Sequence, residues 1–66
     1  MAMGKIRRGN CLFLACLGDH PPRHVHVYQD KKLVVKWDLD HGLAMKGRAT
    51  GKILRLIAEL QREGLL

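Results

Sequence analysis

The sequence lacks a long apolar segment. Its longest apolar run, Cys11–Leu17, is seven residues long, whereas a membrane-spanning helix needs about 20. Lys5, Arg7 and Arg8 precede the run, but it is short for the core of a secretory signal, and a Gly-Asp-His-Pro-Pro turn follows it. We therefore expect a cytoplasmic protein with no membrane partner.

Cysteine is also scarce, and a disulfide is not expected. On one extended strand the Cα atoms of Cys11 and Cys16 would lie about 16 Å apart, too far for a disulfide. Free thiols are typical of a reducing cytoplasm. A chain of 66 residues forms one small domain of marginal stability. Self-association or a metal would help it, and we expect a homodimer.

Acidic residues are few as well. Six Asp and Glu stand against twelve Lys and Arg, so the formal net charge is +6. This charge favours an anionic partner, and nucleic acid before a membrane. The alternative is that the charge serves solubility alone.

The chemically active residue types gather in residues 19–27, which hold both prolines and three of the four histidines. Pro21 and Pro22 fix φ and supply no backbone N–H, so residues 19–22 should form a stiff, extended turn rather than a helix or an inner strand. The turn can bring Asp19 or His20 beside the strand that follows.

From residue 23 onward, apolar and polar residues alternate. Val25 and Val27 would point to the core, and His24, His26 and Tyr28 to the other face, which is the pattern of a half-buried strand. The sequence therefore predicts a strand over residues 23–28 with an outward histidine face.

Two further strands are predicted on either side. Cys11–Leu17 is an apolar run between turn signals, typical of a strand covered on both faces. Residues 33–37 form the third strand, after a hairpin loop at residues 29–32.

The register of this hairpin is restricted. The predicted core positions are Val25, Val27, Leu33, Val35 and Trp37, and they share one face only if the loop has an odd number of residues. We therefore expect a three-residue loop with Asp30 or Lys31 near the left-handed region. One of the two allowed registers places His24 directly across from Asp38, where a carboxylate could orient the ring.

A helix is predicted over residues 49–63, with Thr50 as its cap and an apolar stripe for the core. The stripe is Ile53, Leu56, Ile57 and Leu60. The expected fold is α+β: a three-stranded antiparallel sheet, in the order strand, strand, strand, helix, with the helix on one face. Residues 1–66 form a single domain, with a basic N-terminal arm at residues 1–9 and a folded core at residues 10–64.

The histidine pattern allows two kinds of site. His24 and His26 could bind zinc, with His20 or Asp19 as a third ligand. Alternatively, they could exchange protons on RNA, because imidazole titrates near neutral pH. In that interpretation Asp38 or Asp19 orients one of them, and no cofactor is needed.

Nucleic-acid binding would use cations and one aromatic side chain. Arg23, Lys36 and Arg48 would supply positive charge for the phosphates. Tyr28 shares the histidine face and is the candidate for stacking on a base.

Residues 19–27 read Asp-His-Pro-Pro-Arg-His-Val-His-Val, which resembles the signature Asp-His-x-Pro-Pro-His-x-His-Val of a family of small bacterial proteins of unknown function. The resemblance covers roughly residues 9–66. The hairpin at residues 29–32 and the final Gly-Leu-Leu depart from that family's usual pattern. Its members resemble toxin components of toxin–antitoxin pairs and are often encoded beside a small partner. The resemblance therefore implies an RNA-directed or translation-directed activity and a small partner protein.

Three functional hypotheses follow from the sequence. The first is a toxin-like basic protein that binds RNA on the histidine face and is a candidate ribonuclease. The second is a non-catalytic module stabilised by zinc on His20, His24 and His26. The third is a plain interaction protein that binds a partner chain through its first strand and its C-terminal leucines.

Overall fold

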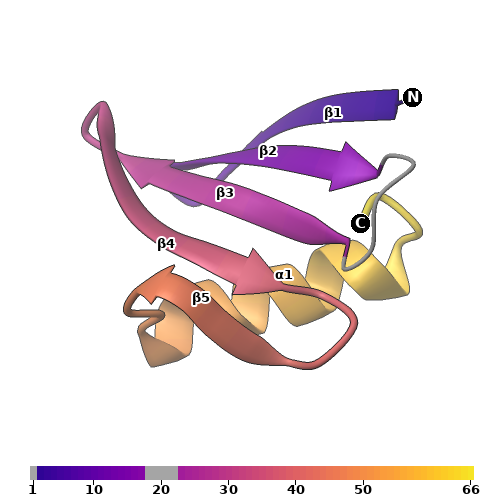
Figure 1. Cartoon of the computed structure of the whole chain (residues 1–66). Coiled ribbons are helices and arrows are strands. Elements are labelled where there is room, and N and C mark those ends of the chain that lie inside the picture. The colour runs from indigo at the N-terminus through magenta and orange to yellow at the C-terminus, as the bar shows by residue number, and fades with distance from the viewer. Residues whose placement is uncertain (1, 18–22) are drawn as a thin grey trace.

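The chain folds into a five-stranded antiparallel sheet with one helix against one face (Figure 1). The computed structural model describes residues 2–17 and 23–66. The strands follow one another across the sheet in chain order. They are β1 (Ala2–Arg8), β2 (Cys11–Leu17), β3 (His24–Gln29), β4 (Lys32–Asp38) and β5 (Leu43–Gly47), and the helix is α1 (Gly51–Arg62).

The α+β class and the C-terminal helix are confirmed, but the prediction of three strands is wrong because the sheet has five. Ala2–Arg8, expected in a basic arm, forms β1 and pairs along its whole length with β2. Leu43–Gly47, for which no strand was predicted, forms β5 at the opposite edge. All five residues of β5 are exposed, so backbone pairing with β4 holds this strand in place. Its sequence shows no alternation of apolar and polar residues that would predict a strand.

The β3–β4 hairpin places Val35 in the core as expected, but by a different route, and the prediction of Leu33 as a core residue is wrong because Leu33 pairs with Tyr28 and is 38% exposed. Its turn has two residues, Asp30 and Lys31, both with positive φ. The predicted three-residue loop is therefore wrong. An irregularity in the pairing inserts Val34 as an extra residue in β4, so Val27 pairs with Val35 while Tyr28 pairs with Leu33. Such a bulge shifts the side-chain alternation by one residue.

The core lies between the sheet and α1. On the sheet side, the fully buried side chains include those of Phe13, Val25, Val27 and Val35. From the helix come Ile53, Ile57 and Leu60, also buried, as the apolar stripe predicts. Cys11 is a buried free thiol in the same cluster. Burial of these side chains is the main stabilising term of so small a fold.

Both ends of α1 are fixed to the rest of the chain. Thr50 caps the N-terminus, as predicted: its Oγ1 accepts a hydrogen bond from the N–H of Ile53 at 3.2 Å. Near the other end, Arg8 of β1 forms an ion pair with Glu63. Leu66 packs against the core. No helix among the described residues is long and apolar enough to cross a membrane.

Candidate functional site

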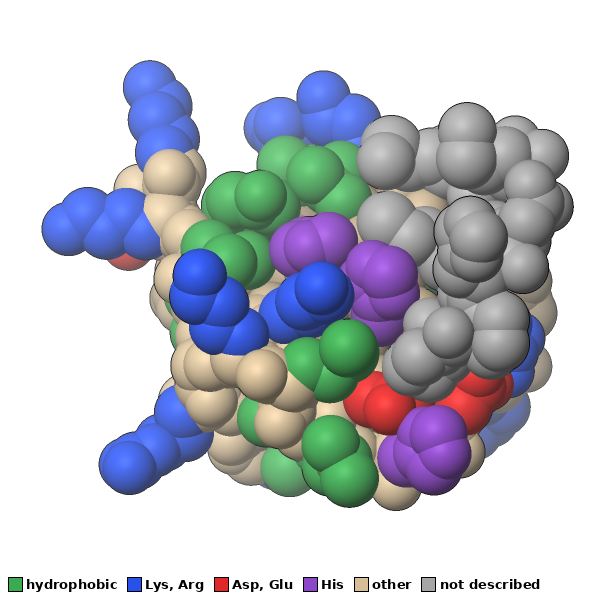
Figure 2. All heavy atoms as spheres, viewed as in Figure 1, with side chains coloured by type: hydrophobic (Ala, Val, Ile, Leu, Met, Phe, Trp, Pro, Cys, Tyr) green, Lys and Arg blue, Asp and Glu red, His purple; other side chains and the backbone are tan. Residues whose placement is uncertain are grey.

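The sheet face opposite α1, which we call the open face, carries the predicted histidine strand. Figure 2 views the molecule from this side and shows histidine side chains next to lysine or arginine and hydrophobic side chains. Two rows of cross-strand neighbours, set by the strand register, organise this face.

The first row, which we call the basic row, crosses all five strands. Its members are Lys5, Leu14, His26, Lys36 and Lys46, each paired with the next on the neighbouring strand. Directly paired residues point to the same side of an antiparallel sheet, and strands lie about 4.8 Å apart, so the row spans about 19 Å. The row thus places three ammonium groups and one imidazole in a line.

The second row, which we call the aromatic row, runs beside the first. It contains Arg7, Leu12, Tyr28 and Leu33. Tyr28 therefore lies on the histidine face, as predicted, with an apolar side chain on each neighbouring strand. The apolar positions of β2 make this half of the open face partly hydrophobic.

His24 and His26 lie two residues apart on β3 and contact each other edge to face. Their ring centroids are 5.2 Å apart and their planes meet at 78°. Burial, followed by the neighbouring His24 and Lys36, lowers the pKa of His26 below its ordinary value of 6.5. A neutral imidazole can accept a proton at pH 7, so His26 is suited to act as a base.

Asp38 lies directly across from His24 in the sheet, which is one of the two registers that the sequence allowed. The carboxylate is 5% exposed. Its Oδ2 lies 2.8 Å from Nδ1 of His41, while Oδ1 accepts the backbone N–H groups of Asp40 and His41, both at 2.9 Å. Burial acts to raise the pKa of Asp38, but these hydrogen bonds outweigh it and lower the pKa.

The histidine that Asp38 orients is thus His41, which sequence reasoning does not place at the site. A carboxylate can only accept, so Nδ1–H of His41 donates to Asp38. The side chain of His41 is 66% exposed. Only the spacing of Asp38 and His41, three residues apart in a turn that ends at Gly42, could have indicated the pair.

Arg23 is held at the same end of the sheet. Its backbone N–H and Nε donate to the two carboxylate oxygens of Asp40 at 2.8 and 3.0 Å, and these bonds lower the pKa of Asp40. Its carbonyl accepts the N–H of Leu39 at 2.8 Å. Arg23, a predicted phosphate ligand, therefore links the start of β3 to the turn after β4.

The other predicted residues are spread out. Lys36 is in the basic row, next to His26. Arg48 follows β5, is exposed, and donates its backbone N–H to the carbonyl of Val34 at 3.3 Å. The predictions for Asp19 and His20 lie outside the described residues. Within residues 2–17 and 23–66, no group of three His, Cys, Asp or Glu could hold a metal ion.

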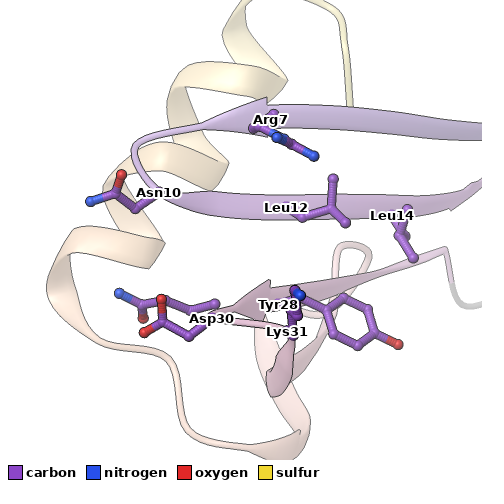
Figure 3. Close-up of a pocket in the computed structure, with 8 residues that line it drawn as sticks. Arg7, Asn10, Leu12, Leu14, Tyr28, Asp30 and Lys31 are labelled. Atoms are coloured by element: carbon purple, nitrogen blue, oxygen red, sulfur yellow. The ribbon is translucent and has the colours of Figure 1, made fainter.

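A pocket of about 630 Å³ opens at the end of the open face nearest the β1–β2 and β3–β4 turns (Figure 3). Sequence reasoning did not predict it, because its lining combines residues of three strands with residues of two turns that are distant in the chain. It is lined by Arg7, Asn10, Leu12, Leu14, Tyr28, Gln29, Asp30 and Lys31. The aromatic row forms much of its wall.

One comparison with known proteins gives a match. A family model described as a domain of unknown function (DUF4160) matches residues 10–64. No curated protein and no solved structure matches the chain. The matched range covers β2 to the end of α1.

Proposed function

The chain belongs to the DUF4160 family of domains of unknown function, and we propose that it binds RNA through the open face of its sheet. The observation that carries this proposal is the basic row, which aligns the three lysines with His26. A line of cations favours a polyanion over a compact anion, because successive phosphates of one strand can each meet a positive charge.

The placement of acidic residues supports the same conclusion. Asp38 and Asp40 lie at one end of the sheet and are engaged by His41 and Arg23. Glu59 and Glu63 belong to the helix side, where Glu63 pairs with Arg8. None of the ion pairs formed within the described part of the chain includes a lysine of the basic row. Their charge is therefore available to a ligand.

The aromatic row favours single-stranded RNA, whose bases are unpaired, as the ligand. Tyr28 offers a ring for stacking beside the line of cations, and sequence-tolerant proteins for single strands combine these two features. A toxin-like role and a small partner protein remain part of the proposal, because the signature in residues 19–27 resembles that of a family whose members resemble toxin components. A homodimer remains part of it because the domain is small, and a cytoplasmic location because free thiols are expected.

RNA cleavage is the second part of the proposal, and it is favoured by the neutral His26 beside Lys36. In this reaction the base takes the proton of a ribose 2′-hydroxyl, whose oxygen then attacks the adjacent phosphorus. An acid protonates the departing 5′ oxygen. His26 suits the first task and the adjoining His24 the second, while Lys36 stabilises charge on the phosphate. Asp38 holds the ring of His41 at the edge of the same face and takes no proton in this reaction.

The test is anisotropy of a fluorescent single-stranded RNA at several salt concentrations. Replacing Lys5, Lys36 and Lys46 together by Gln should weaken binding. It should also reduce the slope of log affinity against log salt by about 2, since each phosphate contact on a single strand contributes roughly 0.7. The matched control replaces the exposed Lys52, Arg55 and Arg62 of α1 by Gln, which removes the same charge from the other side of the protein.

Equal slopes for the two triple variants would refute the open face as the binding surface. Absence of binding by the wild type would refute RNA binding itself and favour the partner-protein hypothesis. A denaturing gel of each endpoint tests cleavage. Product should form with the wild type and disappear with His26→Gln, and intact RNA throughout would restrict the protein to binding.

A further inference from the structure

The pocket at the turn end of the open face has the composition of a nucleotide site. Its apolar part comes from Leu12 and Leu14 of β2, both half-buried. Tyr28 lies directly across from Leu12 in the register. Figure 3 shows the Tyr28 ring on the same side of the sheet as these two leucines. A flat, weakly polar group can therefore lie against an aromatic ring and an aliphatic wall.

The charged lining is arranged for a phosphate next to that flat group. Arg7 is on β1, paired with Leu12, and Lys31 is in the β3–β4 turn, so cations lie on two sides of the apolar wall. Asp30 is the one acid among the lining residues. Both cations are exposed, and an anion bound between them would keep contact with solvent. Such a site suits a phosphate that continues into a strand.

Two amide side chains complete the lining. Asn10 lies in the β1–β2 turn and Gln29 at the end of β3. Each amide offers two donor hydrogens and an acceptor oxygen, which match the mixed donors and acceptors on the edge of a nucleobase. Apolar pockets with a few polar groups and a volume of roughly 300–1,000 Å³ are typical of small-ligand sites. The volume of about 630 Å³ accommodates one nucleotide.

We infer that this pocket binds one unpaired nucleotide, with the base against Tyr28 and the phosphate between Arg7 and Lys31. The inference rests on the proposed RNA binding and deepens it, because a base held at this end fixes where the strand begins its path along the basic row. The same chemistry could come from a nucleotide within an RNA strand or from a free nucleoside monophosphate.

Two arms of one experiment distinguish these sources. In the first, amide chemical shifts of the ¹⁵N-labelled protein are followed during titration with adenosine monophosphate, uridine monophosphate and ribose 5-phosphate. A nucleotide site predicts shifts at Leu12, Tyr28 and Lys31 with the nucleotides and much smaller ones with the sugar phosphate.

In the second arm, a fluorescent single-stranded RNA is titrated with four proteins. The proteins are wild type, Tyr28→Ala, Tyr28→Phe and, as a control on α1, Lys52→Ala. Loss of one stacked base weakens binding by roughly 5- to 160-fold, so Tyr28→Ala should lose affinity within that range. Tyr28→Phe keeps the ring and should bind like the wild type, as should Lys52→Ala.

Each outcome decides a different question. Equal RNA affinity of wild type and Tyr28→Ala, with no nucleotide-induced shifts at the pocket, would overturn the nucleotide site and leave RNA binding standing. Nucleotide-induced shifts without RNA binding would support the pocket as a mononucleotide site and overturn the proposed RNA function. Failure of both ligands to bind would overturn both. Equal shifts from ribose 5-phosphate and the nucleotides would show an anion site and overturn the base contact.

Discussion

The buried carboxylate of Asp38 holds the exposed ring of His41, with 2.8 Å between Oδ2 and Nδ1. The same carboxylate accepts the N–H groups of Asp40 and His41 and so fixes the turn after β4. One acidic side chain therefore shapes the turn and sets the tautomer of a histidine at the end of the open face. This pair ties the stability of the β4–β5 connection to the protonation of Asp38.

The first prediction concerns acid stability. The pKa of Asp38 is lowered, because hydrogen bonds to the ionised form outweigh burial. Its contribution is therefore complete above the ordinary value of 3.8 and is lost as pH falls through the lower pKa of the folded state. The urea midpoint of the wild type should fall steeply below about pH 4, and Asp38→Asn, which cannot ionise, should flatten that fall.

Asp38→Ala separates the charge from the hydrogen bonds. It removes the acceptor of two backbone N–H groups, so it should lower the urea midpoint at pH 7 by more than Asp38→Asn does. Equal midpoints for the wild type and both variants at every pH would contradict a structural role for this carboxylate.

A second prediction tests the core between sheet and helix. Phe13 is fully buried beneath α1, and truncation of a buried Phe to Ala costs about 3–5 kcal/mol. A small domain of marginal stability can lose most of its folding free energy in this way. Leu54→Ala is the control, because Leu54 lies on α1 but is 39% exposed, and it should cost less than about 1 kcal/mol. Urea unfolding followed by circular dichroism measures both.

The third prediction compares two glycines. Gly47 ends β5 with φ +79, and a Cβ there would lie 2.2 Å from the carbonyl oxygen of Val34. Gly47→Ala should cost at least about 1–3 kcal/mol from the backbone conformation, and the clash with Val34 adds to this. Gly51 begins α1 with nothing within 4 Å of such a Cβ, so Gly51→Ala should raise stability by up to about 1 kcal/mol. Thermal unfolding would contradict this account if both variants melted alike.

The elements predicted correctly are those whose side chains alternate or repeat because one face is buried. Val25 and Val27 in β3 and the stripe on α1 that includes Ile57 follow this rule. The strand β2 was predicted from its continuous apolar run instead, and the expectation that both of its faces are covered is wrong, because Leu12 and Leu14 are only half-buried. The cap at Thr50 was also predictable, because the first backbone N–H groups of a helix need an acceptor and a Thr just before the helix supplies one. Hydrophobic periodicity thus defined most of the core, but it left the pairing of His24 with Asp38 as one of two allowed registers.

The elements missed are those held by backbone pairing or by contacts between turns. The strand β5 has no buried face, because even its Leu43 and Met45 are exposed. In β1 the half-buried Ile6 lies among basic residues, which obscure the apolar pattern. The bulge at Val34 restores the core register after a two-residue turn, which no parity argument on the loop could reveal. His41 became part of the site only through the turn built by Asp38. Local sequence carries little information on such contacts.

The last prediction couples RNA binding to protons through His26. Burial, His24 and Lys36 lower its pKa, so the folded protein alone disfavours the imidazolium and should lose stability as pH falls through about 6.5. A phosphate bound beside His26 reverses this preference, because negative charge stabilises the imidazolium. Binding then takes up a proton, and RNA affinity should rise as pH falls, by up to about tenfold per pH unit for one proton.

As pH falls, the stability of the free protein should fall while its RNA affinity rises. These opposite trends make the prediction specific to a histidine in the basic row. Anisotropy titrations from pH 7.5 to 5.5 at fixed ionic strength should show tighter binding at lower pH for the wild type and a reduced slope for His26→Gln. His41→Gln is the matched control, because His41 lies beyond β4 in the turn held by Asp38, so this variant should keep the wild-type slope. A slope that survives His26→Gln would place the bound phosphate away from His26, because only a histidine in contact with the anion changes its protonation on binding.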